Sequence, residues 1–203
     1  MKKVNKTLLV FLLCICCFNI LAGYLVIGHE MTWLHEENGL LENTQVILLI
    51  VTMAAFFLQL YCRKDLHRLF PLAGVFLCLF FILRELDVEK LDVPQILILL
   101  GSGTGRNILM SVAGVVLLIY AVMNFRTIRT FLPQFFFEIS SLTILAGLLF
   151  LVSGWLFDKR VIDTVHYQFF EEILEVTGYY LMFAGAVIGS VSSLGGIEKN
   201  GRA

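Results

Sequence analysis

The sequence has little charge and little proline. Only 15 % of its 203 residues are charged and three are proline, whereas 59 % are hydrophobic. Soluble domains average about 25 % charged and about 45–50 % apolar residues. A composition this apolar therefore excludes an ordinary soluble domain. The formal net charge of −1 and the lack of a basic stripe also exclude a nucleic-acid partner.

Cysteine is scarce outside the apolar segments. Cys14, Cys16 and Cys17 lie in the first apolar stretch, Cys62 lies at the end of another, and Cys78 lies within a third. None falls in a loop predicted to face an oxidising compartment, which excludes a disulfide framework. The segment CICC is surrounded by apolar residues, so we interpret it as apolar filler and not as a metal site.

The sequence is rich in long apolar stretches. A helix needs about 20 residues to cross the hydrocarbon core of a bilayer. Six stretches approach this length, near residues 7–27, 44–62, 69–84, 108–125, 135–157 and 169–193. The third is the shortest and is long enough only if Arg84 and the residues after it enter the membrane. We therefore predict an all-α integral membrane protein, with one polytopic domain built as a bundle of six transmembrane helices.

The first apolar stretch has two interpretations. It begins with the basic segment MKKVNK and ends near the small residues LAG, as a cleaved signal peptide does. A signal peptide has an apolar core of about 7–15 residues, and this stretch is longer. The length favours an uncleaved first span.

The charges predict which way the helices run. Ten of the fifteen lysine and arginine residues fall in the termini and in the loops after the second and fourth spans. The opposite side has five basic residues and thirteen of the sixteen acids. Because basic loops stay in the cytoplasm, both termini are predicted to be cytoplasmic, in a membrane of the bacterial cytoplasmic type.

Acidic residues enter the apolar stretches from the predicted outer side. Glu171 and Glu175 are four residues apart and share one face of a helix, while Glu172 is three residues from Glu175. Like charges on one face need a cation, a proton or a basic partner, and Arg84 is the nearest candidate by depth. The alternative is that these acids face water as solvated helix ends.

The first functional hypothesis is an outward-facing polar site at the membrane surface, which binds or acts on a lipid or a lipid-linked ligand. Its predicted catalytic residues are Glu171, Glu172 and Glu175, and its predicted ligand-binding residues are Arg84, Glu85 and Glu42. Whether the protein is an enzyme stays open. Metal-activated water is the chemistry that such carboxylates could support.

A divalent cation is the predicted cofactor of that site. Glu171, Glu175 and Glu42 are its candidate ligands, and His166 is a weaker one. Carboxylate oxygens suit calcium, magnesium or manganese better than copper.

Two other functional classes remain open. In the second, Arg84 and the glutamates form a structural cluster in a non-catalytic assembly or partner subunit. In the third, the protein transports a small solute or ion, although transport sites usually lie at the midplane on broken helices.

Glycine-containing segments add two predictions. The segment 93–107 is too short to cross the membrane and is predicted to lie in the interface or to re-enter it, with Arg106 near its Gly-rich end. Gly185 and Gly189 have the small-xxx-small spacing that allows close helix contact, and self-association through this face is the predicted use.

The segment TWLHEENGLLENTQ resembles the acidic stretch that precedes the first span of alkaline ceramidases, which forms a calcium-binding loop. The matching residues here are Trp33, Glu36, Glu37, Asn38 and Glu42. Those enzymes have seven spans with zinc-binding histidines inside them, whereas this chain has no histidine deep in a predicted span. We therefore recognise no family and transfer no residue role.

Overall fold

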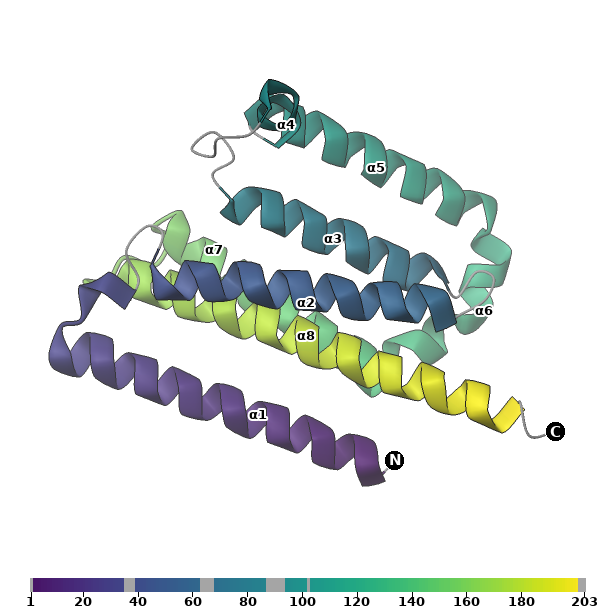
Figure 1. Cartoon of the computed structure of the whole chain (residues 1–203), viewed down its shortest axis with the longest axis horizontal. Helices are drawn as coiled ribbons and strands as arrows, with labels where there is room; N and C mark the ends of the chain where they lie inside the picture. Colours follow the sequence, from purple (N-terminus) through teal and green to yellow (C-terminus); the bar gives the residue numbers. More distant parts are fainter. Residues whose placement is uncertain (1, 35–38, 63–67, 87–93, 102, 201–203) are drawn as a thin grey trace.

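The protein is a bundle of long helices (Figure 1). A computed structural model describes residues 2–34, 39–62, 68–86, 94–101 and 103–200, and these residues contain no strand. Helix α1 is followed by a π-helical turn at Tyr24–Gly28 and a 3-10 turn at Thr32–Leu34. The α-helices are α1 (Lys2–Gly23), α2 (Leu40–Cys62), α3 (Leu69–Glu85), α4 (Gln95–Gly101), α5 (Gly103–Met123), α6 (Phe125–Phe136), α7 (Ile139–Asp158) and α8 (Tyr167–Asn200).

Five segments are long and apolar enough to cross a membrane: Lys6–Gly28, Leu40–Cys62, Gly103–Met123, Ile139–Asp158 and Tyr167–Val191. The prediction of an all-α membrane protein is therefore confirmed at this level. Helix α3, with 17 residues, is at the lower limit for a membrane span. It lies alongside α2, and the two ends of the chain lie at the same end of the bundle (Figure 1).

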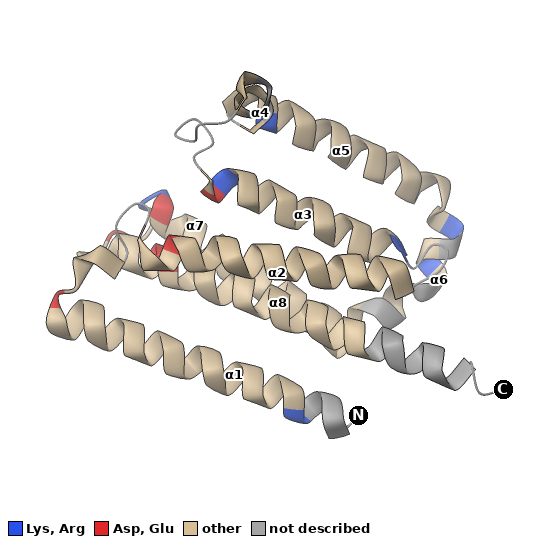
Figure 2. Cartoon of the chain, in the orientation of Figure 1, with Lys and Arg blue, Asp and Glu red and all other residues tan. Residues whose placement is uncertain are grey.

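The acidic residues that Figure 2 shows gather at one end of the bundle, whereas basic residues lie at both ends. We call the end that contains Glu42, Glu85 and Glu171 the acidic end, and the end that contains Arg68 and Arg126 the basic end. The apolar length of the helices lies between them, as expected for a chain whose charged groups remain near the membrane surfaces.

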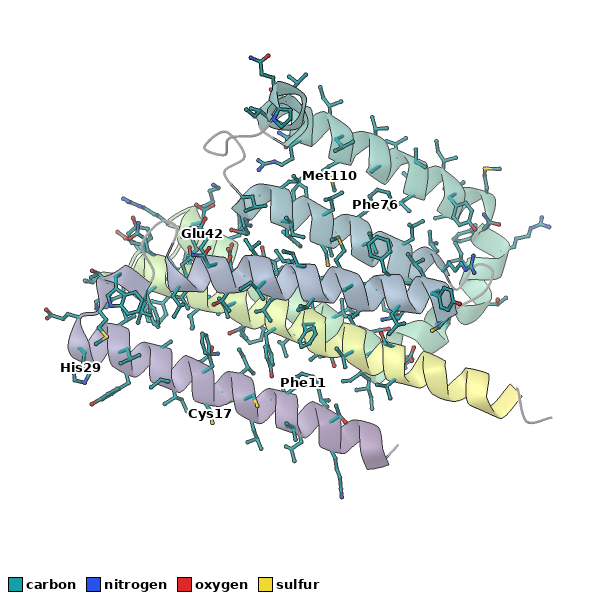
Figure 3. The ribbon with its side chains drawn as sticks, viewed as in Figure 1. Phe11, Cys17, His29, Glu42, Phe76 and Met110 are labelled. Atoms are coloured by element: carbon teal, nitrogen blue, oxygen red, sulfur yellow. The ribbon has the colours of Figure 1, made fainter. Side chains whose placement is uncertain are left out.

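Helix α8 is the centre of the bundle. In its most apolar stretch 78 % of the residues are buried, whereas none are buried in that of α5. Helix α8 packs mainly on α7 and α2, and α1 lies against it through edge-to-face contacts of Phe11 with Tyr180 and Phe183. The side chain of Phe11 points toward α8, while Cys17 points away from the bundle (Figure 3).

Glycines bring α7 and α8 into close contact. A Cβ atom on Gly147 would lie 2.6 Å from the carbonyl oxygen of Gly178, and one on Gly185 would lie 2.7 Å from that of Ser140. Real Cβ atoms do not approach other atoms so closely, so no larger residue fits without a shift of the helices. In a bilayer, such close packing is a main source of helix association, because lipid is as apolar as the side chains.

The face predicted for self-association is used inside the chain. Gly185 packs on Ser140 and Ile144 of α7, and Gly189 packs on Gln59 of α2. Both glycines are buried, so in this structure they mediate contacts between helices of one molecule.

Several boundaries differ from the sequence prediction. The predicted connection at 126–134 is a helix, α6, which contains Pro133. In the Gly-rich segment before the fourth span, Gly101 ends α4 and Gly103 begins α5 with a positive φ of 40°. Short helix α4 lies across the end of α5 (Figure 1). Apolar residues recur at helical spacing in α6, as at Phe125, Ile128 and Leu132, but the prediction rested on long apolar runs and therefore treated this segment as a loop.

The close α7–α8 contact predicts a stability difference between two glycines. Gly178→Ala should lower the free energy of unfolding by about 1–3 kcal/mol, because its Cβ would lie 2.7 Å from Leu151 and 2.8 Å from the oxygen of Gly147. Gly114→Ala on α5 is the matched control, since nothing lies within 4 Å of its Cβ. Thermal unfolding in mild detergent, followed by circular dichroism, measures both. Equal midpoints for the two variants would contradict the packing argument.

Candidate functional site

Helix ends place charged side chains at the acidic end. Helix α3 stops at Glu85 because Leu86 is extended, so Arg84 lies in the last turn. Glu42 lies in the first turn of α2, and Glu171 and Glu172 lie in the first two turns of α8 (Figures 2 and 3). Helix N-termini favour negative charge and C-termini favour positive charge, so the backbone dipole stabilises Glu42 and Arg84 but not Glu85.

The Arg84 network, which we define as Arg84, Glu85, Glu175 and Tyr179, joins α3 to α8. The guanidinium Nη2 of Arg84 forms an ion pair with Oε1 of Glu175 and lies 2.9 Å from Oε1 of Glu85. Its Nε donates to the same Glu85 oxygen at 3.0 Å. The Tyr179 hydroxyl donates to that oxygen as well, at 2.8 Å.

The Arg84 network is largely removed from solvent. The side chains of Glu175 and Glu85 are 4 % and 10 % exposed, while that of Arg84 is 34 % exposed. An arginine stays protonated in proteins, so its buried acceptors must supply the negative charge. The ion pair and the hydrogen bonds satisfy both sides, which is the condition under which a buried pair is tolerated.

A second polar contact joins α2 to α8 beside the Arg84 network. The amide Nε2 of Gln45 donates to Oε2 of Glu172 at 2.5 Å. Gln45 is fully buried, and its Oε1 has no hydrogen-bond partner among the described residues. Glu42 precedes Gln45 by three residues on α2, so both side chains lie on the same face of α2, near the acidic end.

Carboxylates outnumber the guanidinium at this end. The charge of Glu172 interacts with those of four other glutamates: Glu42, Glu85, Glu171 and Glu175. Lys159 is also at this end, where its Nζ lies 2.7 Å from Oδ2 of Asp158 in an exposed ion pair. The Arg84 network neutralises part of the acidic charge, and the remainder needs protons, cations or water.

The structure brings together most of the predicted site residues. Arg84 and Glu175 pair as expected from their depth, and Glu171 is half-buried next to them. His166 is exposed, and its carbonyl accepts a hydrogen bond from the backbone of Phe170. The residues Glu36, Glu37 and Asn38, which matched the ceramidase-like stretch, lie outside the described residues.

The predicted metal ligands do not form a metal centre. Among the residues that the structure describes, no group of three or more histidine, cysteine, aspartate or glutamate side chains is arranged to hold a metal ion. One physical reason is that a carboxylate oxygen of Glu175 is engaged by Arg84, and another is that His166 is exposed.

Arg106, near the end of the Gly-rich segment, contacts the end of α3. Its Nη1 donates to the carbonyl oxygen of Leu83 at 2.9 Å, near the end of α3. Helix C-termini leave such carbonyls without partners, and a basic side chain satisfies one of them. Arg106 thereby links α5 to α3.

Sequence reasoning missed Tyr179 and Gln45. Tyr179 follows Glu175 by four residues, and Gln45 follows Glu42 by three, so helical spacing could have identified both. A further polar contact lies deeper, where Asn19 of α1 donates to the Thr177 hydroxyl at 2.9 Å. That contact joins residues 158 positions apart, and no local pattern indicates it.

Comparison with known proteins identifies no relative. No protein-family model, no curated protein and no solved structure matches the chain. The function is therefore inferred from the geometry of the chain itself.

The ion pair between α3 and α8 predicts a large effect of one substitution. Arg84→Met should lower the free energy of unfolding by about 3 kcal/mol, because it leaves Glu175 buried without its counter-charge. This is the low end of the range for a broken buried pair, since Arg84 is partly exposed. Denaturant unfolding in mild detergent measures the change.

Lys159→Met is the matched control for Arg84→Met. Its pair with Asp158 is exposed, with side chains 56 % and 41 % accessible, so the loss should stay below about 0.5 kcal/mol. The double variant Arg84→Met/Glu175→Met should be more stable than Arg84→Met alone, because it removes the orphaned charge. An equal effect of Arg84→Met and Lys159→Met would refute the assignment.

Proposed function

We propose that this chain is a membrane-embedded, non-catalytic assembly or partner subunit, and that the Arg84 network is its structural clamp. In this proposal α3 is a sixth membrane crossing, both termini are cytoplasmic, and the acidic end faces outward. The excess of basic residues at the other end supports this orientation through the positive-inside rule.

The observation that carries the proposal is the ion pair between Arg84 and Glu175. The guanidinium bridges a carboxylate of its own helix and one of α8, and Tyr179 holds the first of these in place. A ligand-binding arginine would present its donors to a cavity, whereas Nε and Nη2 of Arg84 are engaged by Glu85 and Glu175. The clamp fixes the short helix α3, which has the least apolar length to hold it in the bilayer.

The exposed surface of helix α5 supports the assembly role. Helix α5 has no buried residue, although it is long and apolar enough to span the membrane. It is held through Arg106 and through contacts with α3, where Met110 and Phe76 lie between the two helices (Figure 3). Its outer face is available to lipid or to another membrane protein.

The second candidate is the outward-facing cation-dependent or lipid-binding site. The observation that favours it is the excess of carboxylates, together with the orphaned oxygen of Gln45 beside Glu172. A cation held by Glu172 and Gln45, with Glu171 and Glu42 near, would satisfy this oxygen. Activation of water by that cation, with Glu171, Glu172 or Glu175 as general base, is the corresponding catalytic proposal.

The uninterrupted central helix α8 gives no support to the transporter hypothesis. Transport sites usually form where helices are broken near the midplane, whereas α8 runs without interruption from Tyr167 to Asn200.

Metal analysis distinguishes the first two candidates. Under the clamp proposal, protein purified in mild detergent without chelator should contain no stoichiometric calcium, magnesium or manganese, and EDTA should leave its unfolding midpoint unchanged. Glu175→Gln should be destabilised, because it loses the charge that pairs with Arg84. Glu172→Gln should match the parent, because an amide oxygen can still accept from Gln45. Stoichiometric metal that disappears in Glu172→Gln would favour the second candidate instead.

The proposed topology predicts which engineered cysteines react from outside. In a cysteine-free background, an impermeant maleimide applied to intact cells should label Val165→Cys and spare Met123→Cys. These residues are 92 % and 79 % exposed and lie near opposite ends of the bundle, so accessibility alone does not distinguish them. Labelling of Met123→Cys without Val165→Cys would show that the acidic end faces the cytoplasm. Labelling of both would contradict the proposed pattern of membrane crossings.

A further inference from the structure

A cavity of about 310 Å³ lies between α3 and α7, toward the basic end of the bundle. Helices α2 and α8 form its inner wall, where Phe56 and Met182 line it. Its volume is at the lower end of the range for ligand pockets, about 300–1,000 Å³. The cavity shares no lining residue with the Arg84 network, so it is a separate site.

The lining of the cavity changes from polar to apolar along the bundle. Its polar members, Gln59, Ser140 and Ser141, lie near the basic end of α2 and α7. Toward the middle of the bundle, the wall consists of apolar side chains such as Leu77 and Leu148. Leu148 lies about 10 Å deeper than Ser141, from the rise of 1.5 Å per helical residue. A molecule that matches this lining has a polar group near the membrane surface and a hydrocarbon chain that points toward the midplane.

The hydroxyl of Ser141 lacks a partner in this cavity. Ser141 is one of the lining residues and is only 2 % exposed, and its Oγ has no hydrogen-bond partner among the described residues. An orphaned buried hydroxyl is costly, and in a bilayer little water is present to satisfy it.

The local backbone explains why Ser141 is orphaned. Hydroxyls elsewhere in these helices donate to the carbonyl four residues earlier, as those of Thr52 and Thr143 do. For Ser141 that carbonyl belongs to Phe137, which precedes the extended residue Glu138 at the start of α7. The hydroxyl therefore remains free to donate to a molecule in the cavity.

The cavity is accessible from the bilayer. It is partly open, and Leu145 on its rim is 37 % exposed. Helix α3 packs mainly on α2, and α7 packs mainly on α8, so the boundary between α3 and α7 is the weakly packed side of the bundle. The Arg84 network holds α3 to α8 at the acidic end, which leaves the opening at the basic half.

We propose that this cavity binds one acyl chain of a bilayer glycerolipid, with the Ser141 hydroxyl donating a hydrogen bond to the ester carbonyl of that chain. The carbonyl satisfies the orphaned donor at the polar end of the cavity. The hydrocarbon fills the apolar end beside Leu77 and Leu148. The lipid comes from the leaflet next to the basic end.

Photo-crosslinking in vesicles tests this proposal on the full chain. The probe is a phosphatidylcholine with a diazirine at the end of one acyl chain, mixed into phosphatidylcholine vesicles that contain the protein. After irradiation, mass spectrometry of peptides should find adducts on Leu77, Leu148 or Met182, at the deep end of the cavity. Their yield should exceed the yield on Val115, which is 54 % exposed on α5 and reports contact with bulk lipid.

Two variants separate the cavity from the general lipid surface. Ala73→Leu places a larger side chain in the cavity and should remove most of the excess labelling. Ser141→Ala should lower the excess labelling about threefold, because a typical hydrogen bond inside a membrane protein changes a binding constant by about that factor. The matched controls on α5, Ala113→Leu and Ser111→Ala, should leave the ratio unchanged. If Ala73→Leu does not fold, Leu145→Phe fills the same cavity from α7.

Two outcomes would overturn the proposal as a whole, and a third would refute its hydrogen bond alone. Labelling of the cavity residues at or below the yield on Val115 would show that no acyl chain enters. Equal labelling in Ala73→Leu, Leu145→Phe and the parent would show that the adducts arise from bulk lipid. Loss of labelling with Ala73→Leu but no change with Ser141→Ala would retain the acyl chain and refute its hydrogen bond.

Discussion

The ion pair between Arg84 and Glu175 is the interaction on which the arrangement of α3 depends. A guanidinium at the end of a short apolar helix keeps its charge, so it must find water or a carboxylate. Glu175 supplies the carboxylate from the buried face of α8, and Glu85 and Tyr179 complete the set of partners. The acids at the start of α8 are therefore partly explained, since one of them fixes the position of another helix.

Helix α8 contacts each of its neighbours α7, α3 and α2 through a different kind of interaction. Glycines allow α7 to approach its backbone, Glu175 and Tyr179 hold α3, and Glu172 accepts from Gln45 of α2. In a bilayer the hydrophobic effect does not distinguish one apolar helix from another, so close packing and polar contacts decide which helices associate. The contacts to α3 are concentrated at the acidic end, and the opposite half of the α3–α7 boundary contains the cavity.

The polar residues of the acidic end fall into two groups with different physical roles. The Arg84 network is satisfied internally and behaves as a structural unit. Glu42, Glu171 and Glu172 add negative charge beyond what Arg84 balances, and Gln45 keeps an unused acceptor. A structural clamp alone does not require these additional acids, which is why a ligand at this end stays a second candidate.

Much of the architecture follows from the sequence, because hydrocarbon permits few solutions. Stretches of about 20 apolar residues must be helical in a membrane, since each backbone polar group needs a partner within its own segment. The depth of Arg84 and the i, i+4 spacing of Glu171 and Glu175 also predicted which charges could meet. The helix α6 was not predicted, because it is a short amphipathic helix whose apolar residues follow helical spacing without forming a long apolar run.

The sequence by itself determined the long apolar helices, their membrane character and the concentration of acids at one side. The tertiary structure decided which carboxylate pairs with Arg84, that Tyr179 and Gln45 join them, and that Gly185 and Gly189 pack within the molecule. The reason is that span formation depends on local composition, whereas pairing depends on the rotation and the neighbours of each helix. Those are set by contacts between residues far apart in the chain, as between Arg84 and Glu175, and no short pattern encodes them.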